Sequence, residues 1–476
     1  MHSVSQSEIY RYQNPNIRRM GYLVWFVFGV ISIIFFKERV AFMDGAFQLF
    51  NLINTEEFSI HHYRLTNPLT QIFAWLGVKF GLPLKYVMIG YSFNFIIFHA
   101  FIFHLIVKWC KNDFLGLVQV GFFTLFVTQS FYFLPPEYYQ GMSILLLWTA
   151  ILLQPSFHNS WWRLPLLSTL LILIIFDHAL LSIFFLFIWT FLWLHEKQLR
   201  NPQFYILLGF MILVYILHDI YFTSWYDEAR KGHFWRHWNQ YYPHFENIPG
   251  HKVFLRRCLD TYYLFPILLL TTVISYIRAY LIKHKKVKSP ILKLILVLGF
   301  CFFYLLINHI NDPKTQHLFY MQVNYIGLTI PLLIPLCFDF LPQMDSKKYI
   351  IYVIGIIILI RVITIIQTSD VLKERHKWML SAIEDSGSKK AYVTGNDTPK
   401  DLLIQTWSVP EETLLLTSIN GAENSSSLLI KLSNYKYNLS LDSTHVFLRS
   451  HSAQPIEELN AGYFNLGDSI YYKSEK

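Results

Sequence analysis

The segment KERVAFMDGAFQLFNLINTEEFSIHHYRLTNP (residues 37–68) is the first polar stretch after the first apolar run, residues 20–36. Two arginines immediately before that run favour a cytoplasmic start, which places the segment on the exterior side of a membrane. Its apolar positions between 40 and 53 predict a helix lying on the membrane surface. After Lys37, Glu38 and Arg39 at its start, the segment carries an isolated acid, an acidic pair, two histidines and an arginine, which are Asp44, Glu56, Glu57, His61, His62 and Arg64.

The composition of the whole chain indicates a membrane protein. Charged residues make up 15% of the 476 residues and hydrophobic residues 54%, whereas roughly 25% of a soluble domain is charged. Apolar runs of about 20 residues recur between short basic interruptions, which is typical of multi-pass helical proteins. The net charge of +9 is explained by basic cytoplasmic loops and anionic lipid, and no nucleic-acid partner is expected. The four cysteines show neither a disulfide framework nor metal-ligand spacing.

The apolar runs predict a mainly α fold, a multi-pass transmembrane helical bundle of about 11 spans. The basic segment 283–293 marks the cytoplasmic side. The run 164–194 is interrupted by Asp177 and His178, and a hairpin of two spans would leave the basic residues at both its ends on the cytoplasmic side. The other predicted spans are 20–36, 84–107, 114–133, 141–153, 204–222, 262–282, 294–307, 318–340 and 349–366.

This topology divides the chain into two parts. Residues 1–366 are expected to form the transmembrane domain, with exterior loops at 37–83 and 223–261, and residues 367–476 a small exterior soluble domain. The C-terminal part is polar and long enough for one α/β or β-rich domain. Its β-like runs are 391–394, 413–419, 445–448 and 469–472.

Candidate binding residues gather at the exterior ends of the predicted spans. In the loop 223–259, arginines alternate with tryptophans and tyrosines. They suit either a clamp for an anionic lipid phosphate or an interfacial belt with snorkelling basic side chains. Arg361, in the middle of the last span, needs a buried acid, a lipid phosphate or a bent membrane. The candidate binding residues are His61, His62, Arg64, Arg230, Arg236, Arg256, Arg257 and His309.

Asp44 is the candidate catalytic residue. It follows the first span by eight residues, at the start of the predicted surface helix. It suits a helix N-cap, a base that activates an acceptor nucleophile, or a ligand to a divalent metal ion beside a phosphate. His233 and His237, spaced for one helical face, are better explained as a surface pair because no HExxH motif surrounds them. The metal ligands stay unassigned.

The chain resembles the GT-C superfamily of membrane glycosyltransferases, which use polyprenyl-phosphate-linked sugars. The resemblance lies in the architecture and in the first exterior loop, where 42–47 (FMDGAF) precede a surface helix and 63–68 (YRLTNP) lead into the apolar run 69–79. Asp44 stands alone here, whereas many members carry adjacent acids after the first span. The chain also lacks a WWDYG-like signature in its C-terminal part.

This resemblance implies inverting transfer of a sugar from a polyprenyl-phosphate donor to a glycan, lipid or protein acceptor, with Asp44 as the base. The reaction requires no nucleotide, and a divalent metal ion is the one candidate cofactor. The chain would lie in a membrane, most readily a bacterial inner membrane, with a cytoplasmic N-terminus. The alternatives are a transporter or polymerase of anionic lipid or polysaccharide, and a non-catalytic membrane assembly subunit.

Overall fold

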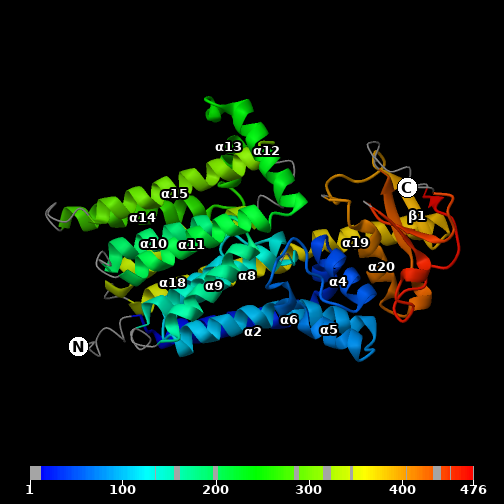
Figure 1. Ribbon diagram of the computed structural model, residues 1–476, viewed down its shortest axis with the longest axis horizontal. Helices are drawn as coiled ribbons and strands as arrows, with labels where there is room; N and C mark the ends of the chain where they lie inside the picture. Colours follow the sequence, from blue (N-terminus) through cyan, green and yellow to red (C-terminus); the bar gives the residue numbers. More distant parts are fainter. Residues whose placement is uncertain are drawn as a thin grey trace.

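The computed structural model describes residues 12–134, 136–154, 161–196, 202–282, 289–314, 323–343, 347–403, 405–431, 441–450 and 452–474 (Figure 1). The chain is mainly helical and carries a small sheet region near its C-terminus, as predicted. Among the described residues, seven helices are long and apolar enough to cross a membrane. These are Pro15–Ile34, Leu84–Trp109, Pro202–Tyr221, Leu264–Ile282, Ser289–Asn311, Val323–Gln343 and Tyr349–Ser386.

The N-terminal helices build one side of the bundle. Helix α6 packs on α2, and α5 packs on α6. Helix α4 was predicted to lie on the membrane surface, but one of its faces is buried within the protein. The elements are α2 (Pro15–Ile34), α3 (Phe36–Val40), α4 (Asp44–Thr55), α5 (Asn67–Lys79), α6 (Leu84–His104) and the π-helical turn η1 (Leu105–Trp109).

The predicted continuous span 114–133 is wrong. Helix α7 (Asp113–Phe122) ends early, and a buried irregular stretch with the short helix η2 (Gln129–Phe131) follows it. Irregular backbone is tolerated at membrane depth only where protein groups satisfy its carbonyls. Arg361 donates to the carbonyls of Thr124 and Val127, and Arg39 donates to that of Phe131. Arg361 therefore meets backbone carbonyls rather than a buried acid.

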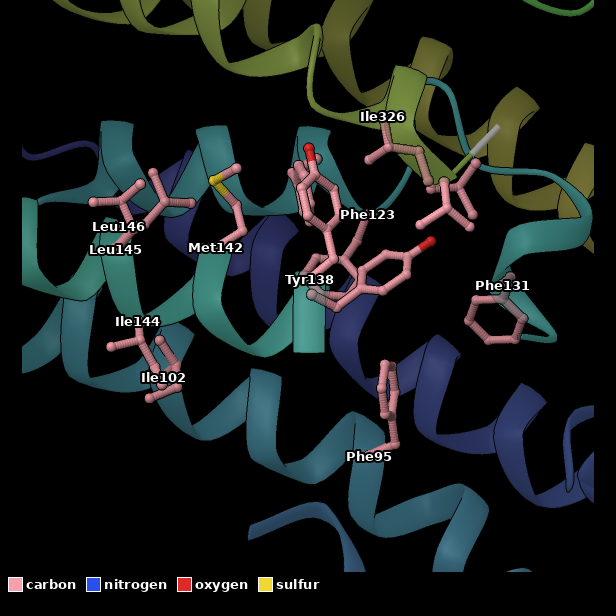
Figure 2. Packing of buried hydrophobic residues seen from close by; sticks show 14 of the residues in the cluster. Phe95, Ile102, Phe123, Phe131, Tyr138, Met142, Ile144, Leu145, Leu146 and Ile326 are labelled. Carbon is pink, nitrogen blue, oxygen red and sulfur yellow. The ribbon is translucent and has the colours of Figure 1, made fainter. Parts of the chain in front are cut away.

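Aromatic side chains fill the core beside this irregular stretch. The rings of Phe123 and Tyr139 lie 5.2 Å apart, and those of Phe122 and Tyr138 lie 6.0 Å apart. The packing fixes the start of α8 (Pro136–Leu153) against the end of α7. Figure 2 shows this part of the core, with Phe95, Phe123, Phe131, Tyr138 and Met142 labelled.

The run 164–194 forms two helices, as the hairpin prediction required. They are α9 (Arg163–Asp177) and α10 (Leu180–Glu196), separated at His178. The first residues of the predicted span 318–340 lie outside the described residues. The following elements are α11 (Pro202–Tyr221), α12 (Trp225–Tyr241), α13 (Pro249–Arg257), α14 (Leu264–Ile282), α15 (Ser289–Asn311), α17 (Thr329–Pro335), the π-helical turn η6 (Leu336–Phe340) and α18 (Lys347–Gln367).

The C-terminal domain combines helices with a parallel three-stranded sheet of order β2-β1-β5, and strands β3 and β4 form a separate antiparallel pair. The predicted strand 413–419 is wrong because it belongs to α20, whose first turn carries a proline and two glutamates that favour a helix start. Sequence reasoning missed β2. The elements are α19 (Ser369–Ser386), β1 (Lys390–Thr394), α20 (Val409–Ser418), β2 (Ser427–Lys431), β3 (Val446–Leu448), β4 (Ala453–Pro455) and β5 (Tyr472–Lys473).

This domain docks directly on α4 at one end of the bundle, and the start of α2 lies at the opposite end (Figure 1). The ring of Phe50 packs between those of Phe447 and Phe464, at 5.5 and 5.7 Å. Asn460 donates to the carbonyl of Ile53 at 2.9 Å. The contact combines apolar packing with directional hydrogen bonds, so it fixes the orientation of α4.

A buried ion pair completes the docking. Arg375 of α19 and Glu412 of α20 are both fully buried and lie 2.9 Å apart. Glu412 also accepts a hydrogen bond from the amide of Met43, the residue before α4, at 3.0 Å. Removing one partner of such a pair leaves an uncompensated buried charge, which is strongly destabilising.

We expect Glu412→Ala to lower the free energy of unfolding by about 3–5 kcal/mol, because it leaves the Arg375 guanidinium buried without its carboxylate. The matched control is Asp370→Ala, which breaks the exposed ion pair between Asp370 and Lys373 of α19, the helix that also carries Arg375. This variant should change the free energy of unfolding little. Denaturant unfolding of the purified protein in detergent measures both. If both variants lowered the free energy of unfolding equally, the buried ion pair would not be what stabilises the docked C-terminal domain.

Candidate functional site

Asp44 begins α4 at a turn held from both sides by the C-terminal domain. Met43 has φ 51° and ψ −125°, a backbone conformation that residues other than glycine rarely adopt. Its amide donates to Glu412, and the ring of His376 donates to the carbonyl of Ala41 at 3.0 Å. These contacts keep the strained turn in place, so the domain determines where the Asp44 side chain lies.

No hydrogen bond or ion pair reaches the Asp44 carboxyl from the part of the chain that the structure describes. It is therefore not a side-chain cap of α4. Burial and, to a smaller extent, the carboxylate of Glu137 raise the pKa of Asp44, the guanidinium of Arg230 lowers it, and the net pKa is about 7. A carboxyl with a pKa near the working pH is well suited to accept a proton from a reacting hydroxyl.

Glu137, at the start of α8, is the second acid of the site. Burial raises its pKa, with Arg64 lowering it and Asp227 raising it. Like Asp44, it has no hydrogen-bond partner among the described residues. Two unpartnered carboxyls that repel each other are costly for folding, and such arrangements are found preferentially at functional sites.

Arg64 is anchored beside this acid pair. Its Nη2 atom lies 3.0 Å from Asp227 Oδ1, its Nη1 atom donates to the carbonyl of Phe176 at 3.2 Å, and its Nε atom is buried without a partner among the described residues. Asp227 completes a capping box with Ser224 at the start of α12. Burial raises the pKa of Asp227, but Arg64 and Ser224 outweigh it, so the net direction is downward. The pair ties the loop between α4 and α5 to α12.

A buried polar group lies beneath the acid pair. Thr66 Oγ1 lies 2.6 Å from Asp177 Oδ1 and 2.9 Å from Gln140 Oε1. The second carboxylate oxygen of Asp177 is buried without a hydrogen-bond partner among the described residues. Helices α8 and α9 approach closely here, because a Cβ atom at Gly141 would lie 3.0 Å from that of Asp177. The two helices thereby keep Asp177 close to Glu137, whose charge reaches it.

The two histidines of the loop between α4 and α5 connect to Arg230 through ring contacts, with 6.3 Å between the rings of His61 and His62. The ring of His62 stacks on Tyr226 at 4.8 Å, and Arg230 Nη2 donates to the Tyr226 hydroxyl at 2.8 Å. His61 lies 2.8 Å from Ser59 Oγ. Burial lowers the pKa of both histidines. The neighbouring His62 lowers the pKa of His61 further, and Arg64 lowers the pKa of His62 further. Both imidazole rings are therefore neutral at neutral pH.

Other predicted binding residues lie apart from Asp44. The charged groups that act on Asp44 are Glu137 and Arg230, and those that act on Glu137 are Arg64 and Asp227. Arg236, Arg256, Arg257 and His309 are not among them. His309 instead contacts His251, with 2.7 Å between their Nδ1 atoms, and lies equally close to the Tyr325 hydroxyl. Arg236 is six residues beyond Arg230, about 9 Å further along α12 at 1.5 Å per residue. The structure therefore gathers Asp44, His61, His62, Arg64 and Arg230 and leaves the other four outside.

Sequence reasoning did not select the other three acids of the site. Glu137, Asp177 and Asp227 come from three separate helix ends, and only packing brings them together. The capping pattern S-x-x-D at Ser224–Asp227 is a local signal that could have found Asp227. No three histidine, cysteine, aspartate or glutamate side chains are placed to hold a metal ion, as far as the described residues go.

Comparisons with known proteins leave the site to be interpreted from its own chemistry. No protein family model matches the chain, and neither a curated protein nor a solved structure matches it.

We expect the pKa of Asp44 to shift in opposite directions in two variants. Glu137→Gln removes a repelling carboxylate and lowers it, whereas Arg230→Gln removes an attracting cation and raises it. Carbodiimide modifies the protonated carboxyl, so labelling of Asp44 should fall as the pH rises through about 7 in the native protein. Peptide mass spectrometry across a pH series gives the midpoint.

Glu57→Gln serves as the control, since Glu57 is an exposed acid of the same loop and should leave the midpoint unchanged. A midpoint that moves the same way in Glu137→Gln and Arg230→Gln would contradict the electrostatic description of the site.

Proposed function

We propose that this protein is a membrane glycosyltransferase that moves a sugar from a polyprenyl-phosphate-linked donor to an acceptor at the exterior face. The observation that carries the proposal is Asp44. It is an unpartnered carboxyl with a pKa of about 7, held at a strained turn at one end of the helix bundle. A lipid-linked donor suits a site at the end of membrane helices, because its polyprenyl chain stays in the bilayer.

The proposed reaction is a single displacement at the anomeric carbon. Asp44 takes the proton of the acceptor hydroxyl, and the hydroxyl oxygen forms a bond to the anomeric carbon. The bond between that carbon and the phosphate oxygen breaks, and its electron pair leaves with the polyprenyl phosphate. Attack from the face opposite the phosphate inverts the anomeric configuration. One C–O bond forms, one C–O bond breaks and one proton moves to Asp44, so the step balances without a nucleotide.

Basic side chains beside Asp44 suit the leaving phosphate. Arg230 lies close enough to influence the pKa of Asp44, and Arg64 has a buried Nε donor without a partner among the described residues. Guanidinium groups are preferred partners of phosphate oxygens, and their charge offsets the negative charge that develops as the bond breaks. Glu137 keeps Asp44 basic enough to accept a proton at neutral pH.

The proposed setting is an integral membrane protein whose acid pair faces the exterior, in a bacterial inner membrane. Membrane lipids surround the bundle, and the acceptor is a glycan, a lipid or a protein. Arg361 supports an enzyme over a transporter. Its guanidinium is engaged with carbonyls of an irregular stretch, so it is not free to line a transport path.

Asp44→Asn tests the proposal. Purified protein in lipid nanodiscs is supplied with a panel of radiolabelled polyprenyl-phosphate sugars and a membrane extract as acceptor source, and labelled product is counted. Asparagine keeps the shape of the side chain but cannot take the proton, so transfer should fall by at least about 100-fold, the lower range for a general base. Binding of polyprenyl phosphate should persist, because the arginines remain.

Glu57→Gln is the matched control and should transfer sugar at the native rate. Full activity of Asp44→Asn would contradict the assignment of Asp44. A native protein that binds no polyprenyl phosphate and transfers no sugar from the panel, yet is purified with a stoichiometric protein partner, would favour an assembly subunit instead.

A further inference from the structure

A cavity of about 370 Å³ lies between α2 and α18. It is near the start of α2, at the end of the bundle opposite the C-terminal domain (Figure 1). Both helices are long and apolar enough to cross a membrane. Its size falls at the lower end of the range for small-molecule sites, roughly 300–1,000 Å³, and is far larger than a site for one ion. The lining residues are Asn16, Arg19, Met20, Ile351, Tyr352, Gly355, Ile356 and Leu359.

The cavity is polar at one end and apolar along the rest of its length. Asn16 and Arg19 belong to the first turns of α2, whereas Ile356 and Leu359 lie further along α18. The two helices run in the same direction, because α2 leads towards α4 and α18 leads into α19, and both α4 and α19 contact α20 (Figure 1). The polar end therefore lies where both helices begin, and the apolar part extends towards the bilayer centre.

Arg19 is the cation at the polar end. Its neighbour Arg18 is neutralised by Asp113, with Nε and Nη2 at 2.8 and 2.9 Å from the two carboxylate oxygens. Arg19 is exposed and has no hydrogen bond or ion pair with the described residues. The positive ends of two helix dipoles add to its field. This end of the cavity is complementary to an anion.

Gly355 keeps the apolar part open. A Cβ atom there would approach only the sulfur of Met20, at 3.6 Å, which is an ordinary contact. Larger side chains at this position would project into the cavity without meeting backbone. Tyr352 is largely exposed beside it, and a tyrosine hydroxyl at the membrane boundary suits a glycerol or phosphate oxygen.

We propose that this cavity binds an anionic phospholipid of the leaflet that faces the starts of α2 and α18. The phosphate of the headgroup contacts Arg19, and part of one acyl chain occupies the space over Gly355. The inference is independent of the proposed catalytic site, which involves none of these residues. The positive-inside trend assigns this leaflet to the cytoplasmic side.

Native mass spectrometry of the full-length protein tests the site with equimolar phosphatidylglycerol and phosphatidylcholine. The native protein should retain phosphatidylglycerol preferentially. Arg19→Gln should weaken phosphatidylglycerol binding by about fivefold, the contribution of one basic residue near an anionic lipid surface. It should weaken phosphatidylcholine binding less, because the choline cation offsets the charge of the phosphate. Gly355→Leu should weaken binding of both lipids, because it fills the acyl-chain space.

Arg278→Gln is the matched control, since Arg278 is an exposed arginine of α14 outside the cavity. It should change neither lipid. The proposal is overturned if the native protein shows no preference for phosphatidylglycerol, or if Arg278→Gln weakens binding as much as Arg19→Gln. It is also overturned if millimolar inorganic phosphate displaces the lipid completely, which would indicate a site for free phosphate.

Discussion

The buried ion pair between Arg375 and Glu412 is the interaction on which the rest of the site depends. Burying two charges costs a large desolvation free energy, which is offset only when further hydrogen bonds satisfy both groups. Glu412 meets this condition by accepting from the Met43 amide, and Arg375 by donating to two carbonyls of its own domain. One pair thereby connects the C-terminal domain to the turn that carries Asp44.

Two further constraints act from inside the membrane bundle. Arg39 and Arg361 supply the hydrogen bonds that the irregular stretch after α7 lacks, and that stretch leads directly into the start of α8. The position of Glu137 thus depends on arginines that lie far from it in sequence. Asp44 is fixed by the C-terminal domain and Glu137 by the bundle, so the acid pair exists only where the two parts of the chain meet.

Local signals explain what could be predicted from the sequence. Hydropathy found α2 and α6, and the interruption at Asp177 and His178 found the break between α9 and α10, because these features depend on a few neighbouring residues. The break after Phe122 was missed because the donors that permit it come from distant helices. Asp44 was identified by its place after the first span, whereas Glu137 was not selected because its proximity to Asp44 follows from packing alone.

We propose that the reacting atoms of a lipid-linked sugar lie beside Asp44, whose pKa Glu137 raises. The most direct measurement is a cryo-electron microscopy structure of the full-length protein in nanodiscs with a non-transferable polyprenyl-phosphate sugar analogue. We expect the sugar to lie beside Asp44 and the phosphate to contact Arg64 or Arg230. A sugar bound elsewhere, for example beside His251 and His309 with Asp44 left in solvent, would contradict it.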